Sequence, residues 1–220
     1  MKKNVAFPVF FLFLFSVSTF VTSAFAAPSF GFKSITNNLA GDAAIGSAQL
    51  HVDLTADGSD KILFTFVNDG PFASSITDIY FDDDDALLSW NQFQYDPVGG
   101  VDFSVGANPP NLPGGNAPAF NFSANHSYDS NPPAQPNGVN PGESLGIRFT
   151  INNSTFDNII TALTMGDLRV GIHVQGFATG GSESFVNTPP DDTNPTPEPA
   201  TMILLGFGLI GLAGIGRRTK

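Results

Sequence analysis

Residues 168–175, with the sequence LRVGIHVQ, carry the pattern that decides how the chain folds. The apolar side chains of Leu168, Val170, Ile172 and Val174 alternate there with smaller or more polar ones. Successive side chains of a β-strand point to opposite faces of a sheet. The alternation therefore predicts a strand with one buried and one exposed face.

The same alternation recurs in residues 50–54, 101–105 and 145–151 and predicts further strands there. Residues 61–67 are more uniformly apolar and are expected to form a central strand, and residues 76–81 and 87–93 are also expected to be strands. Turns that contain glycine separate these runs, as at Asp57-Gly58, Asp69-Gly70-Pro71 and Gly99-Gly100. Short strands at such spacing predict an all-β fold, an antiparallel two-sheet sandwich of about seven to nine strands.

Two segments of the central part depart from this pattern. Residues 154–165 have apolar side chains at helical spacing, and Ser154 or Thr155 is the expected N-cap, so we expect one short helix there. Residues 108–141 are rich in proline, asparagine and glycine. They predict a long loop with one strand near residues 119–123.

The N-terminus has the order of a secretory signal peptide. Two lysines precede a long apolar run, and Ala24 and Ala26 supply the small residues of a cleavage site. This order predicts a signal peptide at residues 1–26 that signal peptidase of the export machinery removes after Ala26. The alternative is a retained N-terminal anchor, which the cleavage site so close to the apolar run disfavours.

The C-terminus has the order of a membrane anchor. A proline-rich linker, residues 189–196, is followed by residues 200–216, which carry no charge, and then by Arg217, Arg218 and Lys220. A helix of that length reaches about 25 Å, close to the hydrocarbon thickness of a bilayer. We therefore expect a transmembrane helix with its basic end in the cytoplasm and the body outside. The alternative, a helix buried in the domain core, is disfavoured because the segment follows a linker and is apolar on all sides.

The residues that precede this helix carry a more specific signal. Pro197-Glu198-Pro199, the glycine-rich apolar stretch and the terminal arginines together resemble the PEP-CTERM sorting domain. The resemblance implies that exosortase, a membrane-embedded protease or transpeptidase, recognises Pro197, Glu198 and Pro199 and processes the chain nearby. It also implies transfer to the cell surface or release, usually in Gram-negative bacteria that make exopolysaccharide. These three residues are then part of a substrate and not of an active site.

Charge and cysteine content limit what the exported body, residues 27–188, can do. From residue 27 to residue 199 the chain has 4 basic and 20 acidic residues, a net charge of −16. The electric field of this negative charge repels nucleic acid and anionic lipid, so we expect no nucleic-acid partner. The chain has no cysteine, which leaves a packed core as the source of its stability.

The acidic run Asp82, Asp83, Asp84 and Asp85 is a candidate metal site. Four adjacent carboxylates repel one another, and Ca²⁺ with its oxygen ligands would relieve that repulsion. Neighbouring side chains of an extended chain diverge, however, so a solvated acidic loop is the alternative. No other cofactor is indicated.

Nothing in the sequence points to catalysis. His51 and His173 fall on expected solvent faces of strands, no two of the three histidines have metal-ligand spacing, and there is no nucleophile elbow or P-loop. Trp90, Tyr80 and Tyr95 could line a sugar-binding surface or belong to the core. We therefore expect a non-enzymatic surface or matrix protein, with a glycan- or Ca²⁺-binding module as the alternative.

Overall fold

The computed structural model describes residues 27–188, and within that range the side chains of all residues except 90–94. The predicted signal peptide (1–26), linker (189–196) and tail (197–220) lie outside the described residues.

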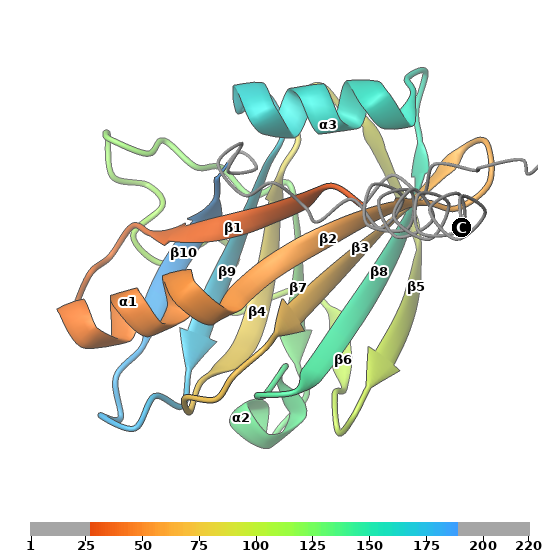
Figure 1. Cartoon of the computed structure of the whole chain (residues 1–220). Helices are drawn as coiled ribbons and strands as arrows, with labels where there is room; N and C mark the ends of the chain where they lie inside the picture. The colour runs from red at the N-terminus through yellow and green to blue at the C-terminus, as the bar shows by residue number, and fades with distance from the viewer. Residues whose placement is uncertain (1–26, 189–220) are drawn as a thin grey trace, which may run out of the picture. The chain divides into compact units, whose positions relative to one another are not determined.

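Ten strands and three helices make up the described body (Figure 1). Their order is β1 (Ser29–Ser34), α1 (Ala40–Gln49), β2 (Leu50–Ala56), β3 (Lys61–Asn68), β4 (Ser75–Asp82), β5 (Leu88–Val98), β6 (Phe103–Val105), β7 (His126–Ser130), α2 (Ala134–Asn137), β8 (Glu143–Ile151), α3 (Phe156–Met165), β9 (Arg169–Gln175) and β10 (Glu183–Asn187).

All strand pairs are antiparallel, and the order across the sheet is β5-β8-β3-β2-β1-β10-β9-β4-β7-β6. Strand β1 changes partner halfway along its length. Residues 29–31 pair with β2, and residues 32–34 pair with β10. The sheet therefore curls into a front half (β5, β8, β3, β2) and a rear half (β10, β9, β4, β7, β6), as seen in Figure 1.

The predicted all-β, antiparallel class is confirmed, and the predicted sandwich needs one correction. The two layers are parts of one curled sheet of ten strands, not two separate sheets of seven to nine strands. The physical reason is β1. Both Phe30 and Phe32 are buried in the core although the two residues pair with different halves, so one short strand connects the layers.

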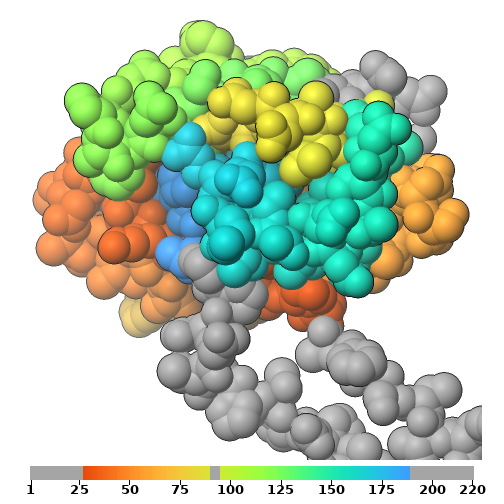
Figure 2. All heavy atoms as spheres, turned by 90° about the horizontal axis from the view of Figure 1, so that it is seen from above, coloured from red at the N-terminus to blue at the C-terminus, as the bar shows by residue number. Residues whose placement is uncertain are grey.

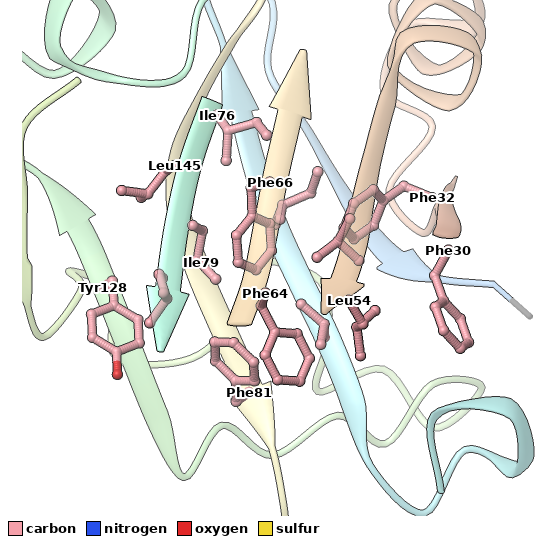
Figure 3. Packing of buried hydrophobic residues seen from close by; sticks show 14 of the residues in the cluster. Phe30, Phe32, Leu54, Phe64, Phe66, Ile76, Ile79, Phe81, Tyr128 and Leu145 are labelled. Atoms are coloured by element: carbon pink, nitrogen blue, oxygen red, sulfur yellow. The ribbon is translucent and has the colours of Figure 1, made fainter. Parts of the chain in front are cut away.

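The core lies between the two halves of the sheet (Figure 3). The Phe81 ring of β4 contacts rings from both halves. Its centroid lies 5.4 Å from that of Phe64, 5.1 Å from that of Phe149 and 6.2 Å from that of Tyr128, at steep interplanar angles. Edge-to-face contacts of this kind add to the free energy gained by burying the rings.

The outer face of the rear half is also covered. Leu112 and Phe122, both in the loop between β6 and β7, pack on Tyr80. A Cβ at Gly171 would lie 2.7 Å from Leu112, so glycine on β9 allows this close packing. The segment is mostly turn, and the predicted strand near residues 119–123 is wrong. The strand of this region is β7, at residues 126–130.

The predicted helix at residues 154–165 is confirmed as α3. The Thr155 side chain caps it by accepting a hydrogen bond from the Asn158 amide at 3.3 Å, and Gly166, at φ 85°, ends it. Helices α1 and α2 were not expected, so three helices replace the predicted one. In α1, Gly46 lies against Phe185, where an added Cβ would be 2.1 Å from the ring.

Candidate functional site

An acidic hollow lies at the end of the body where β4 ends and β9 begins. Its volume is about 270 Å³, and its lining comprises Asp82, Asp84, Asp85, Gly166, Asp167 and Arg169. Asp82 and Arg169 face each other in the β4–β9 register, and this pairing brings together two segments far apart in the sequence. Figure 2 looks onto this end, with the yellow segment after β4 beside the cyan start of β9.

The structure divides the acidic run into two pairs with different surroundings. Asp82 and Asp83 are each 3% exposed, whereas Asp84 and Asp85 are exposed. The Asp83 carboxylate accepts hydrogen bonds from the amides of Leu87 and Leu88 at 2.9 and 3.0 Å. Asp83 thereby fixes the turn that leads into β5.

Asp82 has a partner of opposite charge. Its carboxylate forms an ion pair with Arg169 and accepts a hydrogen bond from the Ser123 amide at 3.1 Å. The same guanidinium donates to the carbonyl oxygens of Phe120 and Asn121, at 2.5 and 2.7 Å. Arg169 therefore ties the loop that covers the rear half to the end of β4.

This division bears on the calcium hypothesis for Asp82, Asp83, Asp84 and Asp85. Asp82 and Asp83 are buried and bound to protein partners, and the exposed Asp84 accepts a hydrogen bond from the Asn125 side-chain amide at 3.4 Å, so only Asp84 and Asp85 are open to solvent. Within residues 27–188 no group of three or more histidine or acidic side chains is placed to hold a metal ion. A cation at this hollow would have to be held by few protein oxygens, with water supplying the rest.

We expect Arg169→Met to lower the free energy of unfolding by about 2 kcal/mol, since it leaves the buried Asp82 carboxylate unpaired. The partial exposure of the Arg169 side chain, 27%, keeps the loss below that of a fully buried pair. Urea unfolding of the variant and the wild type measures this loss. The matched control is Arg148→Met. Arg148 pairs with the exposed Asp57 and Asp96, so its loss should stay under about 1 kcal/mol. Equal losses would contradict the role assigned to Arg169.

The three histidines have different surroundings. His51 lies 3.6 Å from Asp53, and the hydrogen bond with that carboxylate raises the pKa of His51. His126 Nδ1 lies 2.6 Å from the Asn125 carbonyl oxygen. His173 is half-buried, which lowers its pKa, and its Nδ1 lies 3.2 Å from the Ser184 hydroxyl. His173 was expected on a solvent face. Ser184 is 0% exposed, so a substrate could not reach that hydroxyl.

A carboxyl pair was missed by the sequence reasoning. Asp78 of β4 lies directly opposite Asp129 of β7 and is only 4% exposed. Burial raises the pKa of Asp78 to about 7, and the neighbouring Asp129 contributes to the rise. Period-two alternation places Asp78 on an outer face, and the burial of that face gave no local signal in the sequence.

The proposed sugar-binding surface is not formed as expected. Tyr80 is fully buried, and its hydroxyl donates to the Pro109 carbonyl oxygen at 3.0 Å. Tyr95 is 37% exposed. The two rings cannot share a surface, so the part of the hypothesis that included Tyr80 is wrong. The side chain of Trp90 lies outside the described ones.

Comparison with known protein families identifies the tail. Residues 195–218 match the PEP-CTERM protein-sorting motif. The match contains Pro197, Glu198 and Pro199 and extends to the first two basic residues of the predicted stop. No curated protein and no solved structure matches the chain. Among the described residues, no helix is long and apolar enough to cross a membrane, and the predicted span at 200–216 falls outside them.

Proposed function

We propose that this chain, whose tail carries the PEP-CTERM sorting motif, is an exported surface or extracellular-matrix protein that exosortase processes. The observation that carries the proposal is the match of residues 195–218 to that motif. The body has no catalytic role in this proposal. It serves as a structural module that associates with exopolysaccharide.

The residues of the tail have separate roles in the proposal. Pro197 and Pro199 keep the chain extended and remove two amide donors, a form that suits a protease cleft. Residues 200–216 enter the bilayer, and Arg217, Arg218 and Lys220 stay on the cytoplasmic side. The signal peptide at 1–26 starts export of the body in the same orientation.

Two properties of the body are compatible with the proposed role outside the cell. Its core packs without any disulfide bond, because aromatic rings from both halves of the sheet meet around Phe81. Its acidic residues keep it soluble and away from anionic lipid. Association with exopolysaccharide is supported by the sorting class alone.

The test replaces Pro197, Glu198 and Pro199 together by alanine in the full-length chain in its native host. We expect the wild type to lose its apolar tail, and the variant to remain full-length at its C-terminus and in the membrane fraction. Immunoblots of membrane, surface and medium fractions measure this. The control exchanges Thr193 and Asn194 of the linker, which precede the matched residues, for alanine and should be processed as wild type. A triple-alanine variant processed as fully as wild type would refute the proposal.

The second candidate function is a glycan- or Ca²⁺-binding surface module. The observation that favours it is the hollow beside the exposed Asp84 and Asp85. If the hollow binds Ca²⁺, millimolar CaCl₂ raises the melting temperature of the body above its value in chelator, and Asp84→Asn with Asp85→Asn removes the difference. Equal melting temperatures in CaCl₂ and chelator would show that Asp84 and Asp85 are solvated and hold no Ca²⁺.

A further inference from the structure

The last strand before the linker lies inside the sheet. β10 pairs with β1 on one side and with β9 on the other. Phe185 is fully buried, and its ring packs on α1 at Gly46. Glu183 accepts a hydrogen bond from the Leu39 amide at 2.6 Å, and the Thr188 amide donates to the Gly31 carbonyl oxygen at 2.8 Å. Residues at the end of the body thus hold its beginning in place.

The two halves of the sheet cannot join into one folded body, a step we call closure, without β10. In the order of the sheet, the front half is connected to β9 and β4 only through β1 and β10. If β10 were absent, β9 would be an edge strand, residues 32–34 of β1 would lose their partner, and the core beneath Phe185 would be open. Closure must therefore wait until residues 183–188 have joined the sheet.

β10 ends on the acidic side of the body. The Asn187 side chain accepts a hydrogen bond from the Val170 amide at 2.7 Å. Val170 is next to Arg169, which faces Asp82 across the β4–β9 pair. Neighbouring strands are about 5 Å apart, so the end of β10 lies on the order of 10 Å from β4 and its acidic hollow. Thr188, the last residue that the structure describes, directly follows this end of β10.

The distance from this end to the sorting motif is short. Eight residues, 189–196, separate Thr188 from Pro197. A fully extended chain of that length reaches at most about 28 Å. Anionic lipid head groups repel the acidic end within roughly a Debye length, about 8–10 Å at physiological salt.

We propose that the body closes around β10 before the tail is cut, and that residues 189–196 hold the closed body far enough from the membrane for the processing enzyme to reach Pro-Glu-Pro. Residues 183–188 are the last of the body to be exported, and the tail that follows them is still in the bilayer when they arrive. The enzyme therefore meets a folded domain. This inference rests on the proposed function.

The first test asks whether the body folds while its tail is still attached, and it uses a variant that the processing enzyme does not cut. Membranes of the native host containing the triple-alanine variant of Pro197, Glu198 and Pro199 are treated with a non-specific protease from the outside. We expect a resistant fragment close to residues 27–188. The same chain with Phe185→Asp, which keeps β10 out of the core, should be digested at least about tenfold faster. If the Phe185→Asp variant does not accumulate, the uncut variant unfolded in urea serves as the reference for an open body. An uncut body as sensitive as the open reference would overturn the proposal.

The spacing is tested by deleting residues 189–194 from the otherwise native chain, which leaves the whole matched motif in place. We expect the processed fraction to fall about tenfold, since about 20 Å of reach is lost. The control replaces the same six residues by Gly and Ser and should be processed as wild type. A deletion variant cut as fully as wild type overturns the spacing proposal alone. A wild type that is never cut refutes the proposed function instead.

Discussion

The Phe81→Ala variant is expected to lose about 3–5 kcal/mol of its free energy of unfolding, the usual cost of removing a fully buried aromatic ring. Phe81 is 0% exposed and contacts the rings of Phe64, Phe66 and Phe149 in the front half and of Tyr128 in the rear half. The truncation therefore leaves a cavity between the two halves of the curled sheet. Urea unfolding of the body, residues 27–188, measures the loss.

The control for this variant is Phe72→Ala. Phe72 is 59% exposed, and its hydrogen bonds with the Gln49 side chain are made by its backbone, which the substitution leaves in place. Its loss should be below about 1 kcal/mol, as for most exposed substitutions. Similar losses for the two variants would show that the halves do not pack around Phe81.

The second large effect depends on pH. The pKa of Asp78 is about 7 in the folded body and near 3.8 in an unfolded chain. Between about pH 4 and pH 7 the Asp78 carboxyl is ionised in the unfolded chain and still protonated in the folded body. The free energy of unfolding therefore falls as pH rises through this range and is lowest above pH 7. Asp78→Asn keeps the shape of the neutral carboxyl and cannot ionise. We expect its advantage over wild type to be about 3 kcal/mol larger at pH 9 than at pH 5.

Urea unfolding of both proteins at pH 5 and pH 9 measures this difference. The control is Asp85→Asn, which removes one carboxylate that is exposed. Its stability relative to wild type should change by less than about 0.5 kcal/mol between the two pH values. An Asp78→Asn advantage that stays constant with pH would contradict the raised pKa of Asp78.

Strands could be predicted where one side of the sheet stays in water. In β2 the apolar Leu50, Val52 and Leu54 are buried and the polar residues between them are half-buried, so the periodicity of the sequence matches the burial. β8 and β9 keep their buried apolar residues on the core side as expected. The helix α3 was also predictable, because its cap and its apolar spacing are local features.

Elements that depend on distant contacts could not be predicted. α1 has the sequence AGDAAIGSAQ, with two glycines and few large apolar side chains, and it is held in place by the contact of Gly46 with Phe185. β1 connects the two halves because its partners lie at opposite ends of the chain. The burial of β4 on both faces depends on a loop with no periodicity of its own.

The candidate sites differ in the same way. The sorting motif is a continuous stretch of sequence, so Pro197, Glu198 and Pro199 could be identified from the sequence. The match of residues 195–218 confirms the predicted sorting motif. The acidic run is also continuous, but the partners that separate Asp82 from Asp84 come from β9 and from the loop before β7. These partners are brought to the acidic run by the fold, so the sequence next to the run does not reveal them.

The most direct test of the central claim is the intact mass of the protein recovered from the surface and medium of its native host. The account predicts one processed species that begins at Ala27 and lacks the apolar residues 200–216. Recovery from those fractions of an unprocessed chain from Met1 to Lys220 would contradict the account.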